Sequence, residues 1–180
     1  TREVNLYTRQ LMNRNIFKQG EINADIANDV LNQIMFLTKE SDAEINIFIN
    51  SGGGEVASVL VIYDLLKEIK TPINIYCTGM AASMAAVLLT AGQKGRRYIL
   101  PHSKTMIHEP LIAGGVGGSA TSIKTISNSI LETKDIVNTI LAKHTGKSVD
   151  EINEATAFDN YMNAEESVAF GLCDAIKGPL

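Results

Sequence analysis

The sequence predicts an α/β protein, a single domain at 1–180 built on a largely parallel sheet. Two observations lead to this prediction. Between residues 45 and 107, strand-like apolar runs alternate with runs of helical periodicity, and consecutive parallel strands need such crossover helices. The chain has 180 residues, 45% of them hydrophobic, which suits one domain with its own core, and no linker or repeat divides it.

The individual elements follow from local patterns. Residues 45–50 form an apolar-rich run typical of a buried strand, and the glycines that follow break it. Apolar residues then recur at helical spacing up to Ile69, where Thr71 and Pro72 end the helix. In chain order we expect a strand at 45–50, a helix at 56–69, a strand at 73–78, a tight turn at 79–82, a helix at 82–91, short strands at 97–100 and 105–107, and a last helix at 163–170.

One long helix, expected at 119–145, dominates the second half of the chain. It carries an apolar stripe, and Gly146 is a suitable C-cap. Such a helix is on the order of 40 Å long, about the diameter of a compact domain of this size. We therefore expect residues 111–145 to project as a handle whose stripe contacts a partner chain, so that the protein is an oligomer. The alternative is that the stripe covers the protein's own sheet.

Composition and charge exclude several classes of protein. The net charge of −4 argues against a nucleic-acid binder, which usually presents a basic face. No run reaches the roughly 18–20 apolar residues of a membrane span, and the first residues are unlike a secretory signal. We therefore expect a soluble, cytoplasmic protein.

The cysteines and acidic residues suggest neither a disulfide framework nor a metal site. Cys77 and Cys173 are the only cysteines, and Cys77 lies in an apolar run where a buried free thiol is common. No cluster of His, Cys, Asp or Glu has metal-ligand spacing. We expect no metal and no cofactor.

Ser83 is the first candidate for chemistry. It follows a strand and an expected tight turn, and it stands at the start of a helix, where backbone N–H groups point outward. Small neighbours leave space for a substrate carbonyl. An acyl-transfer enzyme needs such a nucleophile on a sharp turn with N–H donors nearby. A serine that merely packs tightly in an alanine-rich helix is the simpler local interpretation.

His108 is the best candidate base among three histidines. It ends the strand at 105–107, and Pro110 makes the exit rigid. His102 lies in a polar turn, and His144 ends the long helix, where interaction with the helix dipole explains it. Asp159 could be partly buried between two helical stretches and orient an imidazole, although an ordinary loop aspartate is the simpler local interpretation.

One glycine-rich segment and one Gly-Lys-Ser segment invite a phosphate-loop interpretation. Residues 51–54 (Ser-Gly-Gly-Gly) lie between a strand and a helix, but no G-x-x-x-x-G-K-[ST] motif is present. Residues 146–148 (Gly-Lys-Ser) lack the upstream glycine and follow a helix. The turn at 51–54 could instead bring a backbone N–H close to Ser83, because adjacent parallel strands end side by side.

Over nearly its whole length the chain resembles the ClpP peptidases, the proteolytic subunits of ATP-dependent Clp proteases. Residues 79–84 (Gly-Met-Ala-Ala-Ser-Met) resemble the nucleophile motif of that family, and residues 106–110 (Met-Ile-His-Glu-Pro) resemble its histidine motif. Asp159 and the residues up to 172 resemble the segment that carries the aspartate. Residues 49–54 are similar to the glycine-rich turn of the family.

The resemblance implies a crotonase-like αβ domain with a handle, and a serine endopeptidase with Ser83, His108 and Asp159 as its catalytic triad. The oxyanion donors would be the backbone N–H groups of Gly54 and Met84. Two seven-membered rings would stack into a tetradecamer, a homo-oligomer or a mixed assembly with a second paralogue. A separate AAA+ Clp ATPase would thread unfolded polypeptides into it, since this chain has no ATPase motif.

Several positions depart from the family pattern. Gly52 stands where proline is usual, which loosens the oxyanion turn, and Ala85 replaces a glycine. Ala157 and Phe158 occupy the places of an acidic residue and an arginine that link the two rings. Glu68 stands where an aromatic residue often helps to form the ATPase docking pocket. Glu55 could bias substrate choice, and the segment 113–118 is slightly longer than usual. We also expect the N-terminal gating loop to be mostly absent.

These departures keep two other functions open. One is a non-catalytic or weakly active ring subunit that assembles with an active paralogue. The other is a crotonase-type acyl-CoA enzyme, which would need an acidic catalytic residue and a CoA site in place of the serine.

Overall fold

The structure, a computed structural model, describes residues 5–180. The expectations that concern the first four residues, the lack of a secretory signal and of most of a gating loop, lie outside this part of the chain. The helices are α1 (Leu6–Met12), α2 (Ala24–Glu40), α3 (Val56–Glu68), α4 (Met84–Thr90), α5 (Ala120–Thr145), α6 (Val149–Thr156) and α7 (Ala164–Phe170). The strands are β1 (Asn15–Gln19), β2 (Ile45–Ser51), β3 (Ile73–Ala82), β4 (Arg97–Ile99), β5 (Lys104–Ile107), β6 (Asn160–Met162) and β7 (Ala175–Ile176).

The seven strands form one sheet that is parallel except at a single pair. β1, β2, β3, β4 and β7 lie side by side in that order, and all four pairings are parallel. The long strand β3 has two further neighbours in succession: residues 75–77 pair with β4, and residues 80–82 pair with β5. β6 then runs antiparallel to β5. The predicted α/β fold with a largely parallel sheet is confirmed.

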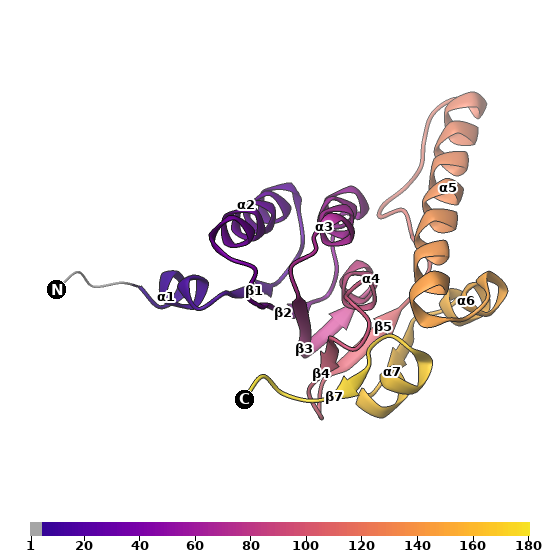
Figure 1. Ribbon diagram of the computed structural model, residues 1–180. Helices are drawn as coiled ribbons and strands as arrows, with labels where there is room; N and C mark the ends of the chain where they lie inside the picture. Colours follow the sequence, from indigo (N-terminus) through magenta and orange to yellow (C-terminus); the bar gives the residue numbers. More distant parts are fainter. Residues whose placement is uncertain (1–4) are drawn as a thin grey trace.

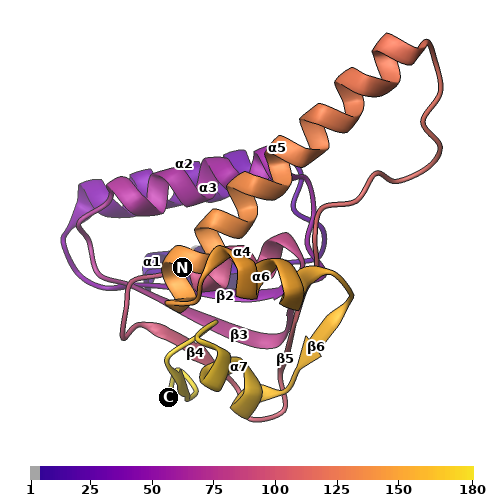
Figure 2. The ribbon, with the colours of Figure 1, turned by 90° about the vertical axis from the view of Figure 1, so that its right-hand side faces the viewer.

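Alternation along the strands gives the sheet two different faces. Ile45, Ile47 and Ile49 belong to the buried core, together with apolar residues of α2 and α3, which lie along one face of the sheet (Figures 1 and 2). The other face carries a stacked row of aromatic rings whose centroids are 4.8, 5.3 and 5.0 Å apart. The row consists of Phe17, Phe48, Tyr76 and Tyr98, which are aligned by the strand register.

The prediction of a tight turn at 79–82 is wrong, because β3 continues through these residues. Gly79 has φ +111°, and a Cβ there would lie 2.7 Å from Oδ1 of Asn50. The Asn50 side chain fills the gap between the strands, and its Oδ1 accepts a hydrogen bond from the Met80 amide at 3.2 Å. The glycine therefore permits an irregularity inside a strand, where the register between β2 and β3 shifts.

The expected handle is present, and α5 extends well beyond the body of the molecule (Figure 2). Its 26 residues correspond to a length of about 39 Å. Ser119 is the N-cap, and Gly146 ends the helix in the left-handed conformation with φ 78°. In the second half of the helix the apolar stripe packs on the protein's own body, where Val137 and Leu141 are buried, whereas Ile123 in the first half is 45% exposed. The expected contact of the stripe with a partner chain stays a prediction.

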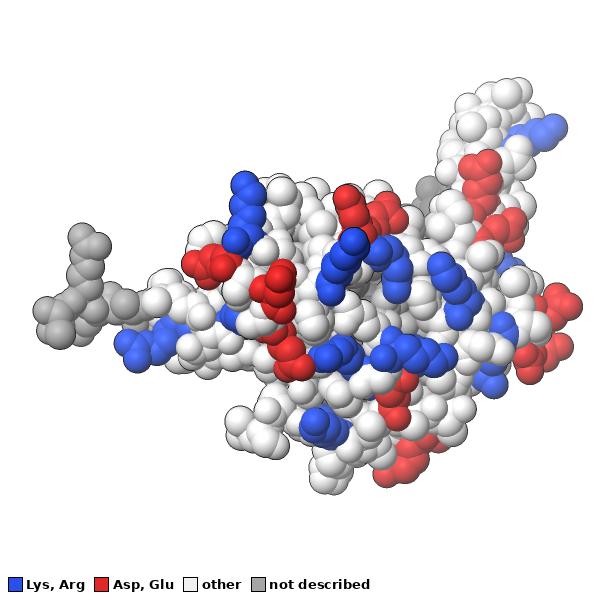
Figure 3. All heavy atoms as spheres, in the orientation of Figure 1, with Lys and Arg blue, Asp and Glu red and all other residues white. Residues whose placement is uncertain are grey.

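Within residues 5–180, no helix is both long and apolar enough to cross a membrane. On the face seen in Figure 1, basic and acidic side chains are interspersed (Figure 3). Cys77 and Cys173 are buried free thiols, as predicted for Cys77.

Candidate active site

Ser83 lies where β3 passes directly into α4. Its backbone has φ 57° and ψ −124°, a conformation that side-chain-bearing residues rarely adopt and that is common at functional sites. The Ser83 amide donates to the Met106 carbonyl at 2.8 Å, which continues the pairing of β3 with β5. The sharp turn expected before this serine is therefore located at the serine itself.

The sheet brings His108 to Ser83. Met106 pairs with Ala82, the residue before Ser83, so His108 leaves β5 at the same end of the sheet. The distance from His108 Nε2 to Ser83 Oγ is 2.8 Å. Since the His108 side chain is only 17% exposed, the imidazole is held between the serine and the protein body.

Asp159 lies on the other side of the imidazole. It comes directly before β6, whose Asn160 pairs with Ile107, the neighbour of His108. Its Oδ1 is 3.1 Å from His108 Nδ1. A carboxylate only accepts hydrogen bonds, so Nδ1 carries the proton and Nε2 is free to accept from the Ser83 hydroxyl. The Asp159 side chain is 63% exposed, so the partial burial that the sequence left open is slight.

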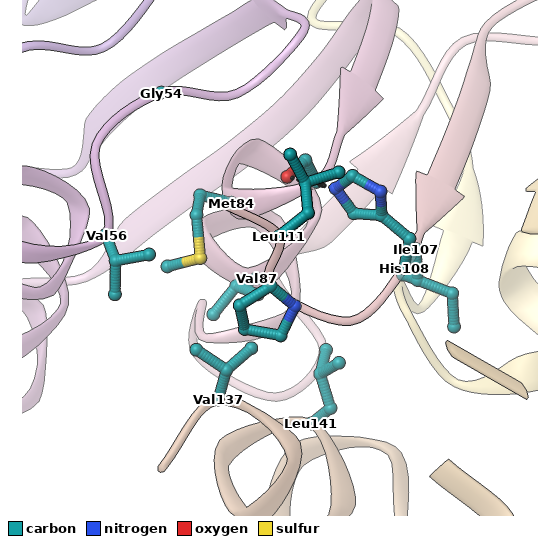
Figure 4. A pocket seen from close by; sticks show the side chains of 11 residues that line it. Gly54, Val56, Met84, Val87, Ile107, His108, Leu111, Val137 and Leu141 are labelled. Atoms are coloured by element: carbon teal, nitrogen blue, oxygen red, sulfur yellow. Dashed lines mark hydrogen bonds between the residues drawn. The ribbon is translucent and has the colours of Figure 1, made fainter. Parts of the chain in front are cut away.

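An apolar cavity of about 190 Å³ opens beside Ser83. Figure 4 shows Val137 and Leu141 on α5 at one side of it, with His108 and Leu111 at another. The remaining lining residues are Gly54, Val56, Ser83, Met84, Val87, Ile107 and Pro110. Apolar side chains of two segments that are distant in the sequence therefore line the space next to the Ser83 hydroxyl.

The glycine turn after β2 passes close to the serine, as the sequence predicts for two neighbouring parallel strands. Ser51 pairs with Ala81, two residues before Ser83. A Cβ on Gly53 would lie 3.0 Å from Ser83 Cβ, and one on Gly54 would lie 2.1 Å from the Ile22 carbonyl oxygen. Both positions therefore need glycine. Gly54 and Met84 line the same cavity, and the Met84 amide, at the start of α4, has no partner within its helix.

The other histidines have contacts elsewhere. His102 is exposed in a turn. His144 Nε2 is 3.0 Å from the Tyr63 hydroxyl, and burial, reinforced by nearby cations, lowers the pKa of His144 to about 4. The ring is therefore neutral near pH 7, and its contact with Tyr63 accounts for its position at the end of α5.

Further candidates from the sequence are explained by local structure. Burial raises the pKa of Cys77 and of Cys173 to about 12, so both thiols are protonated and poor nucleophiles. Ser148, from the Gly-Lys-Ser segment, is the N-cap of α6 and forms a capping box with Glu151. Among residues 5–180, no group of three His, Cys, Asp or Glu side chains could hold a metal ion.

Comparison with known proteins agrees with the resemblance of the motifs. The model of the Clp protease family matches residues 1–179. The chain belongs to the Clp protease family. It is 43% identical over 176 residues to an ATP-dependent Clp protease proteolytic subunit from Ligilactobacillus salivarius, a match that covers 97% of this chain and 88% of that protein.

Family membership confirms the predicted ClpP-like fold and the predicted class of function. As a member of the Clp protease family, the chain is a serine peptidase and a peptidase subunit, and the acyl-CoA enzyme and the non-catalytic subunit are not favoured. The sequence analysis did not predict which residues line the cavity. In the sequence, Val137 and Leu141 can be recognised as part of the apolar stripe of a helix. Only the tertiary packing shows that this part of the stripe faces Ser83.

Proposed function

We propose that this peptidase subunit is an endopeptidase in which Ser83 is the nucleophile, His108 the general base and Asp159 the residue that orients the base. The observation that carries the proposal is the hydrogen-bonded series from Asp159 through His108 to Ser83, next to an apolar cavity. This is the arrangement that serine acyl transfer needs, recognised by geometry and not by position in the sequence.

In the proposed reaction, Ser83 Oγ attacks the carbonyl carbon of a peptide bond while its proton moves to His108 Nε2. Asp159 stabilises the imidazolium that forms. The amides of Gly54 and Met84 donate hydrogen bonds to the oxyanion. His108 then gives the proton to the leaving amine, which breaks the C–N bond and leaves an acyl group on Ser83. Water, deprotonated by His108, hydrolyses this ester and restores the serine.

The cavity beside Ser83 supports a preference for apolar side chains next to the cleaved bond. Its walls are formed by aliphatic groups such as Val87, Val137 and Leu141. Burial of such a side chain contributes on the order of 1.5–3 kcal/mol, whereas a charged side chain would lose its hydration there.

The proposed partners follow from the family and from the name of the relative. The relative is the proteolytic subunit of an ATP-dependent Clp protease, and the present sequence has no nucleotide-binding motif. A separate AAA+ Clp ATPase would therefore use the ATP and deliver unfolded polypeptide. We propose self-association into seven-membered rings. Packing in a ring would also shield Asp159, which is exposed in the single chain. The cytoplasmic location stays a prediction.

The test is hydrolysis of fluorogenic peptides that carry either an apolar or a charged residue before the cleaved bond. We expect the apolar peptide to be cleaved faster. Ser83→Ala should lower its hydrolysis by a factor on the order of 10⁴ or more, with the assembly unchanged in mass by light scattering. Ser129→Ala, an exposed serine on α5, is the control. Retained turnover in Ser83→Ala would exclude Ser83 as the nucleophile.

A further inference from the structure

An ion pair connects the handle helix to the residue that follows His108. Lys134 Nζ on α5 lies 3.1 Å from Glu109 Oε2. The two side chains are 31% and 44% exposed, respectively, so the pair is at the surface, and pairs of this kind contribute little to folding stability. Its position is therefore of more interest than its strength.

The pair lies between two walls of the cavity beside Ser83. Lys134 precedes Val137 by three residues and Leu141 by seven, so all three lie on one face of α5, and the last two line the cavity. Glu109 directly precedes Pro110 and Leu111, which line it from the segment after β5. The ion pair therefore joins the helical wall to the wall that carries His108.

Few other contacts hold this segment. The Glu109 amide donates to the Thr156 carbonyl at 2.7 Å, at the end of α6. The same threonine approaches α5, because Asn138 Nδ2 lies 3.4 Å from Thr156 Oγ1. After residue 109 the chain has no regular structure until α5 begins. Beyond the strand pairing of Ile107 and the hydrogen bonds of the His108 ring, one backbone hydrogen bond and one ion pair thus hold Glu109.

We propose that the Glu109–Lys134 pair is a strap that sets the spacing of these two walls and positions His108 over Ser83. The inference rests on the proposed function, because it assumes that His108 is the base. Glu109 and Lys134 are positioning residues, since neither contacts the Ser83 hydroxyl. A small displacement of a catalytic group has a large effect on rate, so loss of the strap lowers turnover without unfolding the protein.

The experiment compares Glu109→Gln, Lys134→Met and the exchanged pair Glu109→Lys with Lys134→Glu, using an uncharged fluorogenic peptide with an apolar residue before the cleaved bond. We expect each single variant to lower kcat about five- to tenfold with a smaller change in KM. The exchanged pair should recover to within about twofold of the wild type. Lys124→Met and Glu132→Gln, exposed positions on the same helix, are the matched controls and should behave as wild type.

Hydrogen exchange supplies a second measurement that needs no activity. In Lys134→Met, the amide of Glu109, which donates to the Thr156 carbonyl, should exchange faster than in the wild type, whereas Lys124→Met should not change it. Unchanged kcat and unchanged exchange in both single variants would overturn the strap. Loss of activity only in Glu109→Gln, without rescue by the exchanged pair, would also overturn it and indicate that Glu109 contacts the substrate itself.

The same hydrolysis and exchange measurements, with Ser83→Ala included, distinguish a failure of this proposal from a failure of the proposed function on which it rests. If Ser83→Ala abolishes hydrolysis and the strap variants behave as wild type, only the strap is wrong. If Ser83→Ala retains hydrolysis, the proposed function is wrong, and faster exchange in Lys134→Met would then report a structural tie alone.

Discussion

At the scale of single residues, Gly52 and Gly53 look alike in the sequence but have different roles in the fold. Gly53 has φ +112°, and a Cβ there would meet Ser83 Cβ at 3.0 Å and the Ala82 carbonyl oxygen at 3.1 Å. Gly52 has no such backbone conformation, and a Cβ there would meet nothing within 4 Å. The close approach of the turn to Ser83 thus depends on Gly53.

We therefore predict opposite effects of alanine at these two positions. Gly53→Ala strains the backbone by on the order of 1–3 kcal/mol and pushes the turn away from Ser83, so kcat/KM should fall by roughly tenfold or more. Gly52→Ala should keep activity and raise the free energy of unfolding by about 0.4–1 kcal/mol, because it restricts the unfolded chain. Peptide hydrolysis and urea unfolding of both variants test this, and equal activity losses would contradict it.

At the scale of elements, α3 and α5 meet through Tyr63 and His144. The hydroxyl of Tyr63 forms a hydrogen bond with Nε2 of the neutral ring at 3.0 Å. Lys67, on the next turn of α3, adds positive charge nearby and donates to the Ala91 carbonyl at 2.6 Å. Protonation of His144 would make Nε2 a donor toward the Tyr63 hydroxyl oxygen and would place a further cation next to Lys67.

This contact predicts a pH dependence of stability. The pKa of His144 is lowered from 6.5 to about 4 by burial, so between these values the unfolded chain binds a proton that the folded chain does not. Stability should therefore fall as the pH drops from about 6.5 to about 4. Because the ring is partly open to solvent, screening limits the effect to on the order of 1 kcal/mol.

Thermal unfolding of the wild type and of His144→Gln between pH 7 and pH 4.5 measures this effect. Glutamine accepts the Tyr63 hydrogen bond but does not titrate, so the variant should lose less stability on acidification. His102→Gln, at an exposed turn, is the matched control. Identical slopes for the wild type and His144→Gln would show that this contact does not titrate.

Some of the helices and strands could be predicted from the sequence, and others could not. The handle, the strand at 45–50 and the helix at 56–69 follow from strong periodicity, and the structure confirms them. No element is predicted before Ile45, although Ala27, Val30, Ile34 and Leu37 lie on the buried face of α2.

The extension of β3 and the exposure of Asp159 depend on tertiary structure. A glycine with positive φ is typical of a turn, and only the side chain of Asn50, from a neighbouring strand, shows that Gly79 stays in the sheet. Ser83, His108 and Asp159 could be named together because their motifs resemble those of a family. No local pattern predicts that β5 and β6 bring the last two into contact.

At the scale of the whole molecule, exposed apolar side chains gather on and near the handle. Ile123, Leu131 and Ile136 on α5 are 45%, 53% and 50% exposed, and Leu111 is 65% exposed. Phe158, next to Asp159, is 60% exposed. Surfaces of this kind are covered in oligomers, and the handle provides a long one.

If the proposed rings stack in pairs, we predict that the contact between them is apolar, because Ala157 and Phe158 stand at the places of the ionic pair of the family pattern. Phe158→Asp should then lower the mass in solution by half, from a double to a single ring, since a charge cannot be buried there without a partner. Phe158→Leu should keep the wild-type mass.

Salt distinguishes an apolar contact from an ionic one. Raising the ionic strength to about 1 M shortens the screening length to about 3 Å, which weakens exposed ion pairs but not apolar burial. Light scattering of the wild type should therefore give the same mass at low and high salt. Dissociation by salt, or an unchanged mass in Phe158→Asp, would mean that other polar groups hold the rings together. Because Phe158 adjoins Asp159, Phe158→Asp should also lower peptide hydrolysis, in step with the fraction of single rings.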